Sequence, residues 1–518
     1  MSQTNKQQKS HRPERVRIFD TTLRDGGQTA GITFSAEDKM RIAGRLAAFG
    51  IDYIEGGWPG ASPKDDRFFK LAETRDWSHS KLVAFGSTAR PGGPASRDAG
   101  LKKLVASGAD VACIFGKSWD LHVSTALGIT PEENLALVSG SVSFLTRHFE
   151  QVFFDAEHFF DGYASNAGFA LSVLDAAAAA GADALVLCDT NGGNLSSTIE
   201  PVVRDIVARY PDLTIGIHTH NDSELAVANA LVGVEAGARQ VQGTINGIGE
   251  RCGNANLTSI IPALLLKMGF DCGIDKEGLV ELKLVSDFVN EMANRLPWRH
   301  QPFVGLNAFA HKGGIHVSAV RKLSRLYEHI PPEAVGNRQR ITVSDQAGRS
   351  NVLVLAAKTG FGLKLDANDP AVGELVTQVK DLEDQGFAFE AAEASFHLML
   401  LRAKGKLPHF FTLEGFRVID EKRGDDAAPQ AEATVMLRVG KQFAHTASLG
   451  NGPVNAMDRA LRAALQDFYP TLKELRLVDY KVRVLSTSEA TEANVRVLIE
   501  STDGERKWTT VGVSTNII

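Results

Sequence analysis

The stretch Gly216-Ile217-His218-Thr219-His220-Asn221-Asp222 closes a short apolar run with two histidines that stand two residues apart. Such a run is typical of a β-strand, and side chains alternate across a strand, so His218 and His220 should point to the same side. This spacing would let two neutral imidazoles share one metal ion, whereas a helix would need histidines four residues apart. An isolated pair of histidines is more often solvated or hydrogen-bonded, so the rest of the chain has to support the metal hypothesis.

One unit repeats between residues 16 and 268: a short apolar strand, a polar loop, an amphipathic helix and a glycine. Four helices should end at Gly50, Gly108, Gly181 and Gly237, because glycine tolerates the left-handed conformation that closes a helix. Eight such units in about 250 residues predict an α/β fold of the TIM-barrel type, and a doubly wound open sheet is the alternative. The predicted strands are 16–20, 52–56, 81–85, 110–116, 151–156, 184–189, 214–219 and 239–244.

Barrel enzymes carry their chemistry on the loops that follow the strands. In this chain these positions hold carboxylates, imidazoles, hydroxyls and amides, in the segments 21–28, 55–59, 155–158, 189–193, 218–222 and 244–254. Any one of these segments could be a solvated loop. Together they would meet at one rim, and the sequence therefore predicts an active site there.

At 518 residues the chain is too long for one core. Composition divides it into a disordered tail (1–14), the barrel (15–272), a helical linker subdomain (273–405) and a C-terminal α+β domain (406–518). Helices are predicted at 276–294, 370–382 and 391–402, and the last domain should hold strands 432–439, 475–485 and 494–500 with a helix at 454–466. No catalytic cluster is evident in that last domain.

Bulk properties exclude several classes of protein. Hydrophobic residues make up 43% and charged residues 23%, as is ordinary for a globular protein. The net charge of -6 argues against nucleic acid and anionic membranes as partners. Four cysteines without a CxxC pair suit a reducing compartment. Because no secretory signal and no apolar run of about 18 residues is found, we expect a cytoplasmic protein.

Three motifs now carry a resemblance: Leu23-Arg24-Asp25-Gly26, the segment 218–222 and the segment 247–254. They resemble the metal-dependent, Claisen-type barrel family that includes 2-isopropylmalate, homocitrate and citramalate synthases and hydroxymethylglutaryl-CoA lyase. The resemblance extends over the linker and the C-terminal domain, where the turn 450–454 also fits. Within the family, the stretch 55–65 is most similar to the citramalate synthase branch.

The resemblance implies a divalent metal ion (Mg²⁺, Mn²⁺ or Zn²⁺) on Asp25, His218 and His220, with Asn254 as a further or weaker ligand. Two imidazoles and one carboxylate leave coordination positions open, as a catalytic metal requires. On ligand type alone the same set would also suit a non-haem iron oxygenase.

For the acceptor, the resemblance implies a 2-oxo acid that chelates the metal through its keto and carboxylate oxygens. Arg24 would neutralise charge near the keto oxygen, because the N–H donors of its planar guanidinium match the geometry of oxyanions. Thr190 would donate a hydrogen bond to the substrate carboxylate.

The second substrate implied by the resemblance is acetyl-CoA, whose methyl group must lose a proton to a base. The resemblance places Glu157 and His316 at that step, with His316 reaching in from the linker, from a partner subunit. Tyr327 is a weaker candidate on the acetyl-CoA side. Which of Glu157 and His316 takes the proton stays open.

The implied reaction joins pyruvate, acetyl-CoA and water to give citramalate and CoA for isoleucine biosynthesis. The C-terminal domain would be an allosteric module of a homodimer, with isoleucine as the expected effector. The alternatives are another 2-oxo acid such as 2-oxoisovalerate or 2-oxoglutarate, a lyase, or an inactive amino-acid sensor. The glycine at position 27 bears on this choice, because much of the isopropylmalate branch has an acidic residue in this motif.

Several residues have two interpretations. Glu55 could brace the barrel mouth or react with substrate. Cys252 could be a thiol nucleophile, as in the lyase branch, but its neighbours favour a small packing residue. His158 and His311 are expected to be structural. The pair Gly247-x-Gly249 is too short for a dinucleotide fingerprint.

Overall fold

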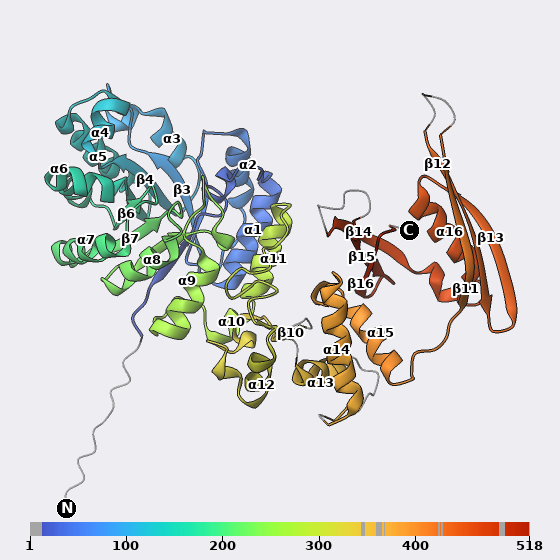
Figure 1. Cartoon of the computed structure of the whole chain (residues 1–518). Coiled ribbons are helices and arrows are strands. Elements are labelled where there is room, and N and C mark those ends of the chain that lie inside the picture. Colours follow the sequence, from blue (N-terminus) through green and yellow to red (C-terminus); the bar gives the residue numbers. More distant parts are fainter. Residues whose placement is uncertain are drawn as a thin grey trace, which may run out of the picture. The chain divides into compact units, whose positions relative to one another are not determined.

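The computed structural model describes residues 13–516, except 343–347, 359–364, 367, 423–424, 426–427 and 486–492 (Figure 1). The predicted disordered tail therefore lies, up to residue 12, outside the described residues. The chain divides into two compact units, Met1–Phe309 with Ile330–Arg338, and Ala310–His329 with Gln339–Ile518. Among the described residues, no helix has the length and apolar character that a membrane crossing requires.

Eight parallel strands form the centre of the first unit, and β1 pairs with β8, so the sheet closes into a barrel. This confirms the predicted TIM barrel and excludes the open sheet. Each observed strand agrees with its predicted range to within two residues at either end. The strands are β1 (Arg17–Asp20), β2 (Tyr53–Gly57), β3 (Lys81–Ser87), β4 (Val111–Lys117), β5 (Gln151–Glu157), β6 (Ala184–Asp189), β7 (Thr214–Thr219) and β8 (Gln240–Gly243).

Helices surround the strands, as Figure 1 shows. They are α1 (Ala36–Phe49), α2 (Pro63–Ala72), α3 (Ala99–Val105), α4 (Asp120–His122), α5 (Pro131–Leu145), α6 (Phe159–Ala179), α7 (Ser196–Arg209), α8 (Ala226–Glu235) and α9 (Leu257–Ala263). Helix α1 begins at a capping box between Ser35 and Asp38 and ends at Gly50, whose φ is 109°. The three other glycines predicted before strands also have positive φ.

Two apolar layers stabilise the barrel. The larger lies between the strands and the helices. The smaller fills the barrel interior, where Tyr53 and Phe153 meet edge to face with ring centroids 5.0 Å apart. Residues two apart share a side of a strand, so Phe153, Asp155 and Glu157 form a series along the inside of β5. This packed layer separates the carboxyl ends of the strands, where Asp155 and Glu157 lie, from their amino-terminal ends.

The first unit continues beyond the last strand. Helices α10 (Lys276–Leu279) and α11 (Leu282–Met292) follow, and α11 packs against α1. Its buried Leu282, Val285 and Val289 belong to the same apolar core as the barrel helices. These residues therefore help to stabilise the barrel itself.

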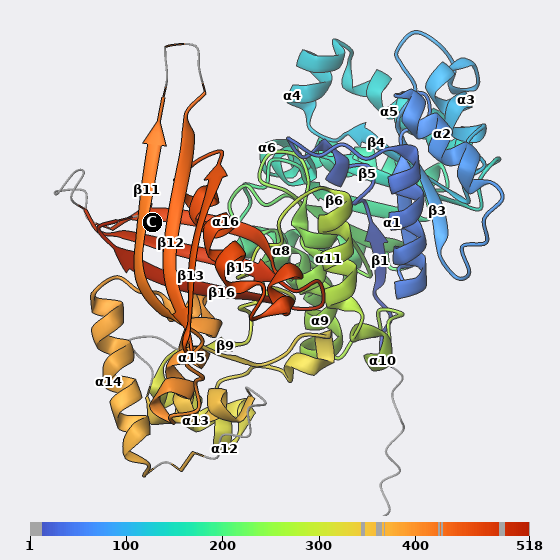
Figure 2. The same cartoon turned by 90° about the vertical axis from the view of Figure 1, so that its right-hand side faces the viewer.

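The second unit begins with a two-stranded parallel sheet of β9 (Ala310–His311) and β10 (Arg340–Ile341). Its helices are α12 (Gly314–Lys322), α13 (Arg349–Lys358), α14 (Pro370–Asp384) and α15 (Glu393–Ala403). Two antiparallel sheets follow, and α16 (Pro453–Leu465) packs against the first of them (Figure 2). The sheets are β11 (Thr412–Glu421), β12 (Gln430–Val439) and β13 (Gln442–Gly450), and β14 (Arg476–Val484), β15 (Val495–Thr502) and β16 (Lys507–Ser514). The predicted α+β character of this part is confirmed.

One face of the sheet β11–β13 is buried and the other is apolar but open. Ala433, Val435 and Leu437 pack with α16. By contrast, Ile419, Phe443 and Leu449, which the strand register places on the other face, are 39%, 51% and 59% exposed. An apolar surface of this kind is typical of a protein–protein contact.

Candidate active site

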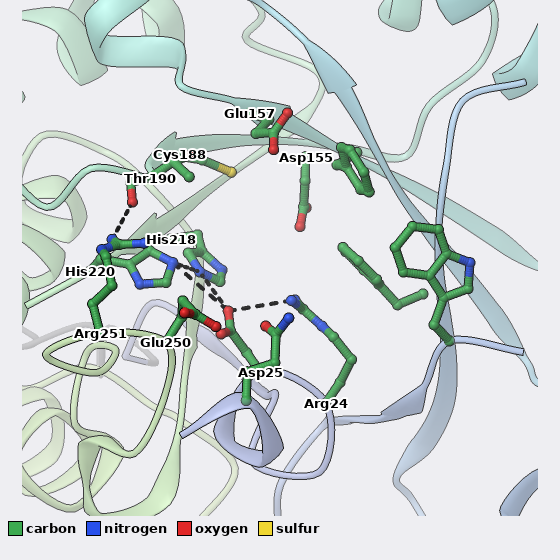
Figure 3. Close-up of a pocket in the computed structure, with 14 residues that line it drawn as sticks. Arg24, Asp25, Asp155, Glu157, Cys188, Thr190, His218, His220, Glu250 and Arg251 are labelled. Atoms are coloured by element: carbon green, nitrogen blue, oxygen red, sulfur yellow. Dashed lines mark hydrogen bonds and ion pairs between the residues drawn. The ribbon is translucent and has the colours of Figure 1, made fainter. Parts of the chain in front are cut away.

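A pocket of about 260 Å³ opens at the carboxyl ends of the barrel strands (Figure 3). Six of the residues predicted for the site line it: Arg24, Asp25, Glu157, Thr190, His218 and His220. The remaining lining residues are Gln28, Trp58, Phe85, Phe115, Asp155, Cys188, Glu250 and Arg251. The structure thus brings these six predicted residues to one cavity.

Asp25, His218 and His220 form a buried group that could hold a metal ion. His218 lies near the end of β7 and His220 directly follows the strand; both line the pocket, as the alternation predicts, with their Nε2 atoms 3.3 Å apart. The Oδ2 atom of Asp25 lies 3.4 Å from Nε2 of His218 and 3.8 Å from Nε2 of His220. Two nitrogens and one carboxylate oxygen therefore converge on one point, which Figure 3 shows.

Asn254 stands beside this group. Its Nδ2 atom lies 3.0 Å from Oδ2 of Asp25 and 3.2 Å from Nε2 of His218, and its buried Oδ1 atom has no hydrogen-bond partner. Because a side-chain amide can be turned by 180°, the same position can present oxygen to an ion. Gly249 permits the close packing of this side chain, since a Cβ atom there would stand 2.1 Å from Oδ1.

The donor set fits a divalent metal ion. Oδ1 of Asp25 and Nδ1 of His220 are buried without a hydrogen-bond partner, so this group is incompletely satisfied by the protein alone. Nδ1 of His218, in contrast, lies 2.7 Å from Oε1 of Gln242. The amide oxygen can only accept, so His218 donates from Nδ1 and its Nε2 faces Asp25.

Electrostatics favour the metal-binding protonation states of Asp25 and His220. At His218 burial lowers the pKa, but the hydrogen bond with Asp25 and the charge of that carboxylate outweigh burial and raise this pKa. Burial alone would raise the pKa of Asp25, but Arg24 and His218 outweigh it and hold this pKa well below its usual range. Burial and the neighbouring His218 lower the pKa of His220 to about 4. Near neutral pH the site therefore holds a carboxylate and a neutral imidazole, the forms that bind metals.

Arg24 is fixed by three contacts. Its Nε donates to Oε2 of Glu55 over 2.7 Å, Nη1 lies 3.4 Å from Oδ2 of Asp25, and its guanidinium carbon lies 3.8 Å from the ring centroid of Phe85. Glu55 is completely buried, does not line the pocket, and also accepts a hydrogen bond from Thr21. Of its two interpretations, the contacts support bracing: Glu55 orients the guanidinium.

Thr190 and Arg251 close the opposite side of the pocket. The hydroxyl of Thr190 accepts a hydrogen bond of 2.9 Å from the backbone N–H of His158, so its own hydrogen is free to donate. Nη2 of Arg251 donates to the carbonyl of Thr190 over 2.7 Å and to Oδ2 of Asp222 over 2.8 Å. Arg251 thereby ties together the loops that follow β6, β7 and β8.

The other predicted residues divide between the units. Glu157 lines the pocket, whereas His316 belongs to the second unit, where its ring stacks on Tyr327 with centroids 4.1 Å apart. The structure thus gathers the metal group, Arg24, Thr190 and Glu157, and leaves the roles of His316 and Tyr327 as predictions. His158 and His311 have the contacts of structural residues, with Asp161 at 3.3 Å and Glu328 at 3.1 Å respectively.

Three pocket residues lie inside the predicted strands, where the sequence does not mark them as part of the site: Phe85, Phe115 and Cys188. Their signal in the sequence is positional, because each stands near the end of a strand and shares its inward side with a core residue two positions earlier. Arg251 lies in a segment predicted for the rim, but its tie to Asp222 requires the folded loops.

The comparisons with known proteins agree with this site. Residues 15–285 match the HMGL-like family, 303–387 the homocitrate synthase post-HMGL domain-like family, and 390–518 the LeuA allosteric (dimerisation) domain. An (R)-citramalate synthase of Aquifex aeolicus is 56% identical, covering 98% of this chain and 95% of the relative. That of Geobacter sulfurreducens is 53% identical, covering 97% and 94%. A probable 2-isopropylmalate synthase of Methanopyrus kandleri is 33% identical, covering 95% and 93%. The chain therefore belongs to the HMGL-like family and, over nearly its whole length, to the citramalate synthases within it.

Proposed function

We propose that the barrel joins the methyl carbon of acetyl-CoA to the keto carbon of pyruvate and, with one water molecule, releases (R)-citramalate and CoA. The observation that carries this proposal is the cavity itself. Within about 260 Å³ it combines the metal-binding group, a fixed guanidinium, a carboxylate and an aromatic wall. The product configuration follows the names of the most similar relatives.

The aromatic wall supports pyruvate as the acceptor. Trp58 meets Phe85 and Phe115 edge to face, with centroids 5.7 and 5.8 Å away, and the two phenylalanines stack at 5.6 Å. These three rings form an apolar side of the pocket that suits the methyl group of pyruvate. A branched acceptor such as 2-oxoisovalerate would need space that the rings occupy.

The polar side would bind the rest of the acceptor. Asp25, His218 and His220, with Asn254 beside them, would hold the divalent cation (Mg²⁺, Mn²⁺ or Zn²⁺), which supplies a Lewis acid for the keto oxygen. Arg24 is already oriented by Glu55 and Phe85, so it can stabilise negative charge on that oxygen without reorganisation. Thr190 donates its free hydroxyl hydrogen to the substrate carboxylate.

The nucleophile is made from acetyl-CoA. Glu157 is the base in this proposal, because it lines the pocket: its carboxylate takes a methyl proton, and the electron pair forms an enolate that attacks the keto carbon. His316, from the second unit of a partner subunit, acts on the thioester side of acetyl-CoA. Water then hydrolyses the citramalyl thioester and releases CoA.

The C-terminal domain supports regulation in a homodimer. It matches the LeuA allosteric (dimerisation) domain over residues 390–518 and exposes apolar residues on β11 and β13. We infer that isoleucine binds this domain and inhibits the barrel. Light scattering coupled to gel filtration, and activity assays over a range of isoleucine concentrations, test both points.

The direct test of the reaction is product analysis. Purified protein with pyruvate, acetyl-CoA and a divalent cation should yield one (R)-citramalate per CoA on a chiral column. Formation of 2-isopropylmalate from 2-oxoisovalerate, with no product from pyruvate, would replace this proposal by the related synthase.

A further inference from the structure

Two charged residues stand side by side where β4 and β5 end. Lys117 is the register partner of Glu157 in the parallel pair, and its Nζ forms an ion pair with Oε2 of Glu157. The two side chains are only 18% and 23% exposed. Among the residues that the structure describes, Lys117 forms an ion pair with no other carboxylate. This contact is therefore specific to Glu157.

The ends of both strands are held firmly. The buried Ser118 donates to the carbonyl of Glu157 from its hydroxyl over 2.7 Å and from its backbone N–H over 3.3 Å. The buried Asn134 donates to the carbonyl of Lys117 over 2.9 Å. The ammonium also lies 5.4 Å from the ring centroid of Phe115, which is part of the aromatic wall. The hydrogen bonds thus fix the backbone from which both side chains extend, and the ring contact restricts the lysine side chain itself.

The two carboxylate oxygens of Glu157 have different surroundings. Glu157 lines the pocket, whereas Lys117 does not. Oε2 is bound to the ammonium, and Oε1 accepts no hydrogen bond from any described residue. One oxygen is thus an anchor, and the other is free to accept a proton from a substrate.

From this arrangement we propose that Lys117 is a positioning residue that anchors the Glu157 carboxylate for removal of the methyl proton from acetyl-CoA. The inference rests on the proposed role of Glu157 as the base. In the step itself the methyl C–H bond breaks, an O–H bond forms on Glu157, and the electron pair passes into the thioester enolate. Lys117 touches neither substrate and acts only through the carboxylate.

The consequence for the rate follows from geometry. A glutamate has three rotatable side-chain bonds, and a displacement of about 1 Å from the reactive position costs on the order of 10²-fold in rate. Removal of the anchor should therefore slow proton removal, while binding of pyruvate on the other side of the pocket should change little.

The test compares Lys117→Met and Lys117→Arg with the wild type, using acetyl-CoA and its methyl-deuterated form. Lys117→Met should lower kcat by about 10- to 100-fold, leave the KM for pyruvate within about twofold, and show a primary isotope effect at least as large as the wild type. Lys117→Arg should recover part of kcat, because it keeps the charge. A wild-type kcat in Lys117→Met, a proportionate rise in the KM for pyruvate, or an isotope effect that falls to unity would overturn the proposal.

Lys81→Met is the matched control. Lys81 forms an ion pair of 2.9 Å with Glu150 at the opposite end of the barrel, so loss of that pair should leave kcat unchanged. If circular dichroism shows Lys117→Met to be unfolded, Lys117→Gln replaces it in the same test.

Glu157→Gln separates the two proposals: a wild-type rate in that variant removes Glu157 as the base. A dead Glu157→Gln beside a normal Lys117→Met rejects only the role of Lys117.

Discussion

Nδ1 of His218 lies 2.7 Å from Oε1 of Gln242, and this hydrogen bond determines how the imidazole faces the metal-binding group. The amide is itself oriented, because its Nε2 donates to Asp155 over 3.1 Å. Asp155 also accepts a hydrogen bond of 3.2 Å from the thiol of Cys113. A buried chain of hydrogen bonds thus fixes the His218 tautomer before any ion arrives.

Gln242→Leu should weaken binding of a divalent cation by about 10- to 100-fold, because the tautomer and orientation of His218 are no longer fixed. Isothermal titration calorimetry of the metal-free protein measures this affinity. Gln240→Leu is the matched control, since Gln240 is a buried glutamine on the same strand whose Oε1 has no hydrogen-bond partner. An equal loss of affinity in both variants would show that the effect is not specific to His218.

Asp25→Ala and His220→Ala should each abolish turnover and leave the barrel folded, because each removes a metal ligand from the rim. The activity assay and circular dichroism are needed together. His79→Ala, which replaces an exposed histidine, should behave as the wild type. Near-normal activity in either ligand variant would be incompatible with the metal assignment.

Phe115→Ala should shift the choice of acceptor. It removes one ring of the aromatic wall but spares Phe85, on which Arg24 stacks. The ratio of kcat/KM for 2-oxobutanoate to that for pyruvate should rise about tenfold or more, since one methylene in an apolar pocket is worth roughly 10- to 200-fold. An unchanged ratio would mean that this ring does not limit the acceptor.

Asp20→Asn should change how stability depends on pH. Burial raises the pKa of Asp20 to about 7, although Thr22 donates two hydrogen bonds to it. The folded state therefore binds the Asp20 proton more tightly than the unfolded state, and its contribution to stability is lost as pH rises from about 4 through about 7. Urea unfolding of the metal-free proteins measures this effect. As pH rises over this range, the free energy of unfolding of the variant should increase relative to that of the wild type. If the difference in the free energy of unfolding between the two proteins stayed constant over this range, burial would not raise the pKa of Asp20.

Mixed dimers test whether His316 acts on the partner's barrel. Glu157→Gln and His316→Gln should each be inactive alone. After the two are unfolded and refolded together, about a quarter of wild-type activity should return, because half of the dimers are mixed and each of these contains one intact site. If His316 served the barrel of its own chain, no mixed dimer would hold an intact site and the mixture would stay inactive.

Local patterns predicted most of the barrel. Gly50 and Gly237 mark the turns that precede β2 and β8, and the alternation along β7 placed His218 and His220 on one side. The family resemblance, confirmed by the comparisons, added the function and the candidate residues around Asp25.

The parts of the site that the sequence does not predict depend on contacts between strands. In the sequence, Phe85 and Phe115 look like ordinary core residues. Only the closed barrel shows that they lie at the carboxyl ends of their strands and line the pocket. Gln242 reaches His218 across β7 and β8, and Lys117 reaches Glu157 across β4 and β5. Such pairs require the strand register, which a single sequence does not contain.

The most direct measurement is release of CoA thiol from acetyl-CoA with pyruvate and, separately, with 2-oxoisovalerate and 2-oxoglutarate, with and without a chelator. A metal-dependent citramalate synthase should release thiol with pyruvate, lose this activity on chelation, and regain it with an added divalent cation. Thiol release that persists in the chelator, or that occurs only with a longer or branched 2-oxo acid, would contradict this account.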